Sequence, residues 1–86
     1  MVLNERVFKA LANRRRLAIV RLLKQRLRVS VGDIASHLKV SMPTASKHLS
    51  ILAAADIVDY ERVSLAIYYS LADKPTAIMR NVLKHI

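Results

Sequence analysis

The side chains with the clearest capacity for specific chemistry lie together in the middle of the chain. Between residues 41 and 48 the sequence places hydroxyls, one ammonium group and one imidazole, on Ser41, Thr44, Ser46, Lys47 and His48. Hydroxyl and imidazole groups donate and accept hydrogen bonds, and a lysine ammonium can reach a guanine edge or a phosphate. This set is therefore suited to contacting the bases and phosphates of a nucleic acid.

Three of these residues also have a purely structural interpretation, which the sequence leaves open. Ser41 can serve only as the N-cap of a helix, and Ser46 can be a solvated position on that helix. His48 can be a packed, hydrogen-bonded residue at the boundary of the core. We expect the buried edge of the same helix at the spacing i, i+4 and i+7, on Ala45, Leu49 and Leu52.

The charge of the chain points to an anionic partner. Its 15 basic and 6 acidic side chains give a net charge of +9, and a domain with such an excess usually meets a polyanion. Residues 1–30 hold nine basic side chains against Glu5 alone, a net of +8 (nine minus one). We therefore expect the front of the chain to take part in anion binding, although a merely basic surface is the alternative that charge alone leaves open.

The composition also excludes several kinds of site. There are no cysteines, which removes disulfides, thiolate metal sites and thiol redox sensing. His37, His48 and His85 are far apart in the sequence and form no helical pair that could chelate zinc, which leaves only two copies of His85 meeting across a dimer axis. One glycine cannot build a phosphate-cradling loop. We predict no metal, no cofactor and no enzymatic activity.

The length and the apolar pattern predict a single domain that meets no membrane. The 86 residues contain one glycine and two prolines, so residues 1–86 form one domain without a flexible linker. No apolar run approaches the roughly 18 residues that a membrane span needs, and the first residues lack the pattern of a signal peptide. Together with the absence of cysteine, these features predict a cytoplasmic protein.

Apolar periodicity and capping residues predict four helices in the first part of the chain. The first spans residues 3–12, and the next three each follow a residue type that caps helices: Asn13, Ser30 and Ser41. Pro43 stands in the first turn of the fourth helix, where its missing N–H is tolerated. The third and fourth helices are separated by a tight turn, which is the spacing of a helix-turn-helix unit.

A hairpin and a last helix are expected to complete the fold. Residues 57–62 and 66–71 are rich in β-branched and aromatic residues and predict two strands, joined by residues 63–66. Asp56, before them, is expected to take a left-handed conformation. A final helix with a broad apolar face is predicted over residues 73–86. The expected fold is mostly α (α+β): four helices, a two-stranded wing and one helix.

The hydrophobic content predicts a second copy of the chain as a partner. It is 53%, above the roughly 45–50% of an average domain, although so small a domain buries only a little over half of its unfolded surface. We therefore expect some apolar surface to be buried in a homodimer, with a dense monomeric core as the alternative.

Several segments, taken in order, carry a family resemblance. They are FKALA (8–12), RLAIV (16–20), VGDIA (31–35), VSMPTASKHLSIL (40–52), IV (57–58) and YYSL (68–71). The first two are similar to F-x-A-L-A and R-L-x-I-L, and the fourth to V-S-Q-P-T-V-S-R-H-L-x-x-L. Together they resemble the opening motif, positioning helix, recognition helix and wing of the ArsR/SmtB family of dimeric winged-helix repressors.

The resemblance implies where DNA and a second subunit would bind. The first and last helices would form a two-fold dimer, and both carry spare apolar faces, on Leu3, Val7, Ile78, Val82 and Ile86. The fourth helix would enter the major groove of double-stranded DNA, with its DNA side formed by Ser41, Thr44, Ser46, Lys47 and His48.

Cations outside that helix extend the predicted DNA surface. Arg14 and Arg15 stand in the first turn of the second helix, where their charges oppose the helix dipole, and we expect them to hold phosphates. The alternative is that these long side chains simply extend into water. Arg16 matches the family's arginine but can be structural. Arg62 is the candidate DNA contact of the wing.

The chain departs from the family pattern in three places. The wing tip, residues 63–66, is apolar where the family often carries a Gly-Arg-type tip, and the nearby Asp59 and Glu61 would repel phosphates. Asp56 replaces a common glycine. Neither family metal site is matched, because the chain has no cysteine and residues 75–86 contain no Asp or Glu. We expect neither a metal switch nor a thiol switch.

Three functions are compatible with these features. The first is a sequence-specific regulator, a repressor by resemblance, that binds a pseudo-palindromic operator as a dimer. The second is a non-specific or architectural nucleic-acid-binding protein, which the basic front of the chain favours. The third is a winged-helix module that docks a protein through its apolar wing tip.

Overall fold

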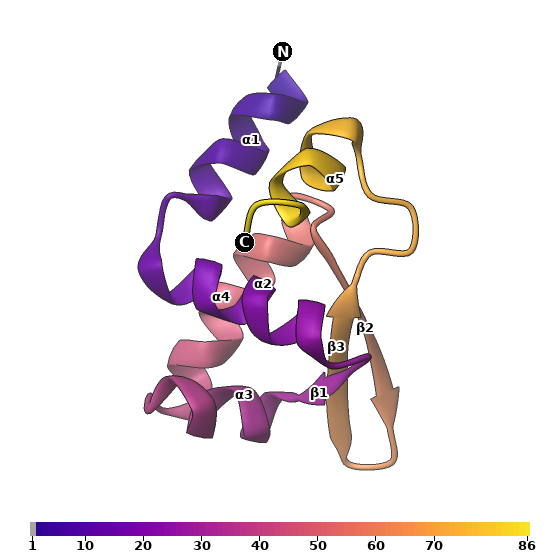
Figure 1. Ribbon diagram of the computed structural model, residues 1–86. Helices are drawn as coiled ribbons and strands as arrows, with labels where there is room; N and C mark the ends of the chain where they lie inside the picture. Colours follow the sequence, from indigo (N-terminus) through magenta and orange to yellow (C-terminus); the bar gives the residue numbers. More distant parts are fainter. Residues whose placement is uncertain (1) are drawn as a thin grey trace.

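The computed structural model describes residues 2–86, with side chains from residue 5 onward (Figure 1). Its helices and strands follow the predicted order, with one additional strand. Their bounds are α1 Val2–Leu11, α2 Arg14–Gln25, β1 Val29–Ser30, α3 Val31–Leu38, α4 Met42–Ala54, β2 Val58–Val63, β3 Ala66–Leu71 and α5 Ala77–Leu83. α1 and α5 lie together at one end of the molecule and the hairpin tip at the other. The predicted winged helix-turn-helix fold is confirmed.

The three predicted N-caps are all present. The Asn13 side chain accepts hydrogen bonds from the backbone N–H groups of Arg15 and Arg16, at 2.9 and 3.1 Å. The hydroxyls of Ser30 and Ser41 each accept one from the third residue after the cap, at 3.1 and 3.2 Å. Each bond satisfies a backbone donor that has no partner within its helix, so the sequence fixes the starts of α2, α3 and α4 locally.

The last helix is shorter than the sequence predicts. It begins at Ala77 rather than near residue 73, because Thr76 is its N-cap and accepts from the backbone N–H of Met79 at 3.2 Å. Pro75 pushes Lys74 away from helical backbone angles, so a helix that begins at residue 73 is disfavoured. The helix ends at Leu83 instead of continuing to residue 86.

The sheet has a third strand that the sequence analysis missed. β1 pairs antiparallel with β3, with Val29 opposite Tyr69, and the strand order is β1-β3-β2. β1 is only two residues long and ends at the cap of α3, so it carries no alternating pattern. Its effect is to tie the start of the helix-turn-helix unit to the hairpin.

The hairpin turn is tighter than the predicted loop over residues 63–66. Val63 pairs with Ala66, so only Ser64 and Leu65 form the turn. Ser64 has φ 58°, and positive φ at this place is typical of two-residue hairpin turns. Asp56 has φ 59°, which confirms the left-handed conformation predicted for it.

The core is formed by the inner faces of all the helices and of the sheet. Ala45, Leu49 and Leu52 of α4 are fully buried, as predicted, and they pack in one cluster with Ile19 and Val20 of α2. α2 therefore crosses the middle of the molecule, with α4 held against it along one edge.

Arg16 joins three helices through one guanidinium group. Its Nε and Nη2 atoms donate to the backbone oxygens of Ala10 and Lys9 at the end of α1. Its Nη1 atom lies 3.2 Å from Nδ1 of His48 on α4. A guanidinium only donates, so Nδ1 accepts and the neutral imidazole carries its proton on Nε2.

This junction favours neutral His48. Burial lowers the pKa of His48 below its ordinary value of 6.5, and the positive charges of Arg16, Arg15 and Lys47 lower it further. Protonating the imidazole would cost the hydrogen bond from Arg16 and place another cation beside three others.

We expect Asp56→Gly to stabilise the protein and Asp56→Ala to destabilise it. Both substitutions remove the same charge, but only glycine lacks the Cβ that disfavours φ 59°. The expected change in the free energy of unfolding is about +0.5 kcal/mol for glycine and about −0.5 kcal/mol for alanine. Urea unfolding at one fixed protein concentration measures both, and equal effects of the two substitutions would contradict the backbone argument.

We also expect the free energy of unfolding to decrease as the pH is lowered, because of His48. The unfolded chain protonates this residue near pH 6.5, whereas the folded protein does so only at lower pH. The contribution of neutral His48 to the free energy of unfolding is therefore complete above pH 6.5, and it is lost as the pH falls through the folded-state pKa of this residue. His48→Asn keeps an acceptor near Arg16 but does not titrate, so its free energy of unfolding should fall less between pH 7 and pH 5. Parallel profiles for the two proteins would refute this.

Candidate nucleic-acid interface

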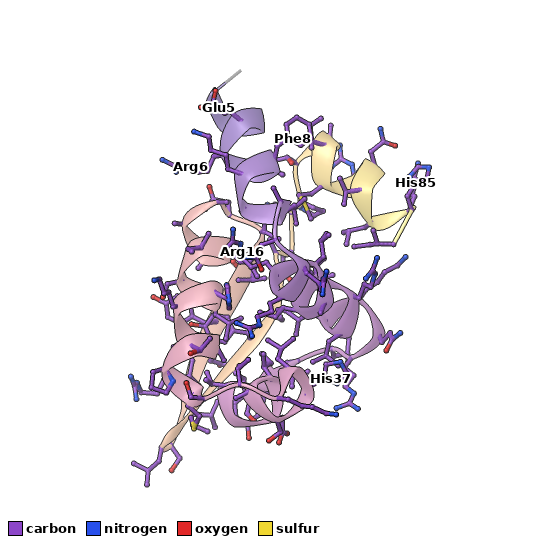
Figure 2. The ribbon with its side chains drawn as sticks, turned by 90° about the vertical axis from the view of Figure 1, so that its left-hand side faces the viewer. Glu5, Arg6, Phe8, Arg16, His37 and His85 are labelled. Carbon is purple, nitrogen blue, oxygen red and sulfur yellow. The ribbon has the colours of Figure 1, made fainter. Side chains whose placement is uncertain are left out.

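α4 is embedded along one edge and open along the other. Its inner edge is fully buried, whereas Ser46, Lys47 and Ser50 on the other side are exposed. Figure 2 shows α4, in pink, along one side of the molecule with side chains projecting away from it. An exposed helix edge that carries hydroxyls and a cation is the arrangement that groove reading requires.

Ser41 and Thr44 form a local hydrogen-bonded pair at the start of α4. The Ser41 hydroxyl accepts from the Thr44 backbone N–H and donates to the Thr44 hydroxyl at 3.0 Å. The cap interpretation of Ser41 therefore holds, and its hydroxyl orients that of Thr44. Thr44 is half-buried, whereas Ser41 is exposed.

His48 is the residue for which the packed interpretation has direct support. It is half-buried and its Nδ1 atom is engaged by Arg16. The proton on Nε2 remains the one that His48 can donate to an external acceptor. The sequence could not show this contact, because Arg16 and His48 are 32 positions apart.

The basic first turn of α2 divides into two kinds of residue. Arg16 is structural, as the junction between α1, α2 and α4 shows. Arg14 and Arg15 are exposed. Arg15 lies close enough to His48 for its charge to lower the pKa of that residue. Arg15 therefore extends the positive charge of the α4 edge.

The wing carries fewer free acids than its sequence suggests. Glu61 forms an ion pair with Arg28 at 3.0 Å, and the Arg28 guanidinium lies 4.6 Å from the centre of the Tyr68 ring. Arg62, the predicted wing contact, is exposed on β2. The role of Arg28 was missed, because it depends on a neighbouring strand and leaves no local pattern.

The wing tip and the start of α4 enclose an apolar hollow. It has a volume of about 330 Å³ and is lined in part by Met42, Ser46 and Leu65. Leu65 is 98% exposed at the tip, and Met42 is 54% exposed. The sequence indicated the apolar tip but not Met42 as its neighbour across the hollow.

A second apolar surface lies between α1 and α5. Phe8 is 55% exposed, and Figure 2 shows it between the two helices. With Ile78, Val82 and Ile86 it lines a shallow hollow of about 400 Å³. Ile78 and Val82 of α5 and Ile86 after it are half-buried, as expected of an incompletely covered face.

Of the two predicted interface residues on α1, only Val7 has a described side chain. Val7 is 3% exposed and packs in the core of its own subunit, so it offers no surface to a partner. The helical period places Phe8, not Val7, on the outer apolar face. The side chain of Leu3 lies outside the described residues.

Metal-binding clusters and membrane-spanning helices are both absent from the described residues. In residues 2–86, no three His, Cys, Asp or Glu side chains are grouped so that they could hold a metal ion. No helix in that part of the chain combines the length and apolar character that crossing a membrane requires.

Known proteins have sequences related to this chain. A family model described as a helix-turn-helix domain matches residues 11–61. The transcriptional repressor SdpR of Bacillus subtilis (strain 168) is 43% identical over 65 residues, which cover 76% of this chain and 71% of SdpR. A transcriptional repressor SmtB homolog of Synechocystis is 39% identical over 80 residues, covering 92% of this chain and 60% of that protein.

A solved structure extends the likeness to the fold. The solution structure of Mb0332 from Mycobacterium bovis is a homodimeric winged helix-turn-helix DNA-binding domain, described as a possible ArsR-family transcriptional regulator. It matches with a TM-score of 0.81 and 33% identity over 95% of this chain and 72% of that one. The chain belongs to the ArsR/SmtB family of helix-turn-helix transcriptional regulators, which are not enzymes.

Proposed function

We propose that the protein is a sequence-specific transcriptional repressor that binds a pseudo-palindromic operator in double-stranded DNA as a homodimer. The observation that carries this proposal is the exposed polar edge of α4, opposite a fully buried edge. The repressor assignment is supported by the names of SdpR and the SmtB homolog.

Different side chains on and near α4 are assigned to the bases and to the phosphates of DNA. Ser46 and Lys47 are exposed near the start of the helix, where recognition helices contact base edges. Thr44, oriented by Ser41, is placed for a base or a phosphate. Arg14 and Arg15 supply charge for the phosphate backbone, which contributes affinity without sequence information.

The dimer follows from the apolar face between α1 and α5. Phe8 and the half-buried side chains of α5 form a continuous apolar surface that a second copy can cover. A two-fold dimer would present α4 twice, at half-sites about one helical turn, roughly 10 bp, apart. The proposal includes no thiol sensing site, since the chain has no cysteine. It includes no metal site either, since the described residues hold no group of three His, Asp or Glu side chains that could bind a metal ion.

The two alternative functions predict different DNA-binding behaviour from that of a specific repressor. A non-specific binder should prefer no sequence, so excess random duplex would displace it from any site. A protein-docking module using the hollow beside Leu65 would bind DNA with no dependence on α4. Selection of genomic fragments by the purified protein, followed by footprinting at physiological salt with random competitor, separates these from a specific repressor.

We expect Lys47→Ala with Thr44→Ala to reduce operator affinity at least about 30-fold, since each good base or phosphate contact contributes about 1–3 kcal/mol and two are removed. Lys74→Ala is the matched control, because it removes an exposed cation outside α4 and should change affinity less than about twofold. Fluorescence anisotropy with the footprinted site measures both. Unchanged affinity in the double variant would show that α4 is not the recognition helix.

We expect Phe8→Glu to convert the dimer into monomers, because it places a charge on the apolar face between α1 and α5. Its matched control is Leu65→Glu, which adds the same charge at an even more exposed apolar residue, on the wing tip. Sedimentation velocity should show Phe8→Glu as a monomer and Leu65→Glu as a dimer at the same concentration. A dimer in both would place the interface elsewhere.

A further inference from the structure

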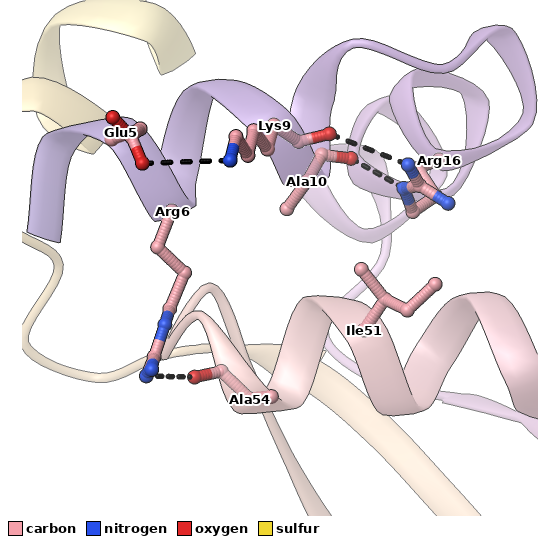
Figure 3. A pocket seen from close by; sticks show the side chains of 7 residues that line it. All are labelled: Glu5, Arg6, Lys9, Ala10, Arg16, Ile51 and Ala54. Atoms are coloured by element: carbon pink, nitrogen blue, oxygen red, sulfur yellow. Dashed lines mark hydrogen bonds and ion pairs between the residues drawn. The ribbon is translucent and has the colours of Figure 1, made fainter. Parts of the chain in front are cut away.

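A groove between α1 and α4 combines free positive charge with an apolar wall. It has a volume of about 550 Å³ and is lined by residues of α1, by Arg16 of α2 and by the last turns of α4 (Figure 3). We propose that this groove binds a small organic dicarboxylate and that this binding weakens the hold of the protein on its operator. The second half of this statement rests on the proposed function.

The cations of the groove outnumber its acids. Arg6, Lys9 and Arg16 line it together with a single acid, Glu5. Glu5 is paired with Lys9 at 3.4 Å. Arg6 donates to the backbone oxygen of Ala54 at 3.0 Å, and Arg16 donates to backbone oxygens and an imidazole. Among the described side chains, neither guanidinium is paired with a carboxylate.

The placement of these charges indicates a ligand with two anionic ends. Figure 3 shows the guanidinium groups of Arg6 and Arg16 at opposite ends of the space between the helices, with Ile51 and Ala10 between them. Guanidinium groups favour carboxylates, which they can bind through two parallel hydrogen bonds. A short aliphatic chain between two carboxylates would place its apolar body against the wall, and the volume is within the range of small-molecule sites.

The groove is separate from the other two surfaces. It shares no lining residue with the apolar face around Phe8 and Ile78. The exposed groups of the α4 edge, Ser46 and Lys47, do not line it either. A ligand can therefore occupy it in a dimer that also presents α4 to DNA.

Both guanidinium groups also hold α4, which couples the groove to recognition. Arg6 bonds the last turn of α4 through Ala54, and Arg16 bonds His48 nearer its start. A carboxylate that takes N–H groups from Arg16 competes with the His48 imidazole for them. Binding therefore changes how α4 is held, and the two ligands, dicarboxylate and DNA, oppose one another by linkage.

The site is tested on the dimeric protein without DNA. Succinate, glutarate and adipate are titrated beside butyrate, a monoanion, and succinamide, a neutral analogue, at matched ionic strength. At about ten times its Kd, a bound dicarboxylate should raise Tm by about 8 °C. The proposal requires at least one dicarboxylate to bind at least tenfold more tightly than both analogues, by isothermal titration calorimetry; equal affinities would overturn it.

Matched variants identify the groove as the place of binding. Arg6→Gln removes one of the two guanidinium partners, and Lys9→Gln removes a lining cation and leaves the Glu5 carboxylate without its ion pair. Each should weaken dicarboxylate binding about tenfold, whereas Arg21→Gln, which removes an exposed cation of α2 outside the groove, should not. Circular dichroism confirms folding, and Lys9→Gln suffices if Arg6→Gln unfolds. An equal loss in Arg21→Gln would show general charge attraction and overturn the site.

Operator binding is then measured with and without the dicarboxylate. At about ten times the ligand Kd of the parent protein, the expected operator affinity is at least fivefold weaker with the ligand in the parent and at most about twofold weaker in Lys9→Gln. If Arg6→Gln and Lys9→Gln instead weaken operator binding without ligand, these cations hold DNA phosphates and the proposal is wrong. Ligand binding measured without DNA stands even if no operator exists, so the two failures are distinguishable.

Discussion

The placement of α4 depends on one packing constraint. Ala45, Leu49 and Leu52 are spaced so that they fall on one helix edge, and all three are fully buried against the core. Rotating the helix by even one residue, about 100°, would expose these apolar side chains and bury Lys47 or Ser46. Both changes are unfavourable in free energy, because apolar burial is lost and a polar group is removed from water. The burial of the inner edge therefore decides which residues face outward. The chemistry of the outer edge is free to vary without affecting the fold.

Arg16 adds a second constraint that burial alone does not supply. Apolar packing is not directional, so it fixes the depth of α4 better than its tilt relative to α1. The guanidinium group of Arg16 donates in fixed directions to the end of α1 and to His48, which joins the two helices at one point. Because this point is polar and half-buried, it is strong only while each partner keeps its protonation and position. A rigid recognition helix thus depends on a contact that pH or a competing acceptor can disturb.

The features that could be predicted from sequence are those whose cause is local. A cap such as Ser30 or Ser41 bonds a backbone group three residues away, so the sequence contains both partners. The buried edge of α4 follows from helical period alone. β1 was missed because its cause is Tyr69 on another strand. The start of α5 was misplaced because Asp73 and Pro75 are common helix starters, while Thr76 is the residue whose hydroxyl reaches the backbone. The α1–α4 groove was missed for the same reason as β1, since Arg6 and Ala54 are 48 positions apart.

The distribution of charge shows why composition overstates a binding surface. Five of the nine cations in residues 1–30 have intramolecular partners, Arg6, Lys9, Arg16, Lys24 and Arg28. Lys9 and Arg28 pair with side-chain carboxylates. Arg6 and Arg16 donate to uncharged acceptors, so their charge persists while their direction is fixed by the fold. A cation whose side chain is hydrogen-bonded to a backbone oxygen still attracts anions, but the fold fixes the position at which it can contact one. Net charge therefore predicts that this protein attracts anions, but not where they bind. The positions of the cations in the fold direct some anions to the groove between α1 and α4 instead of to the exposed edge of α4.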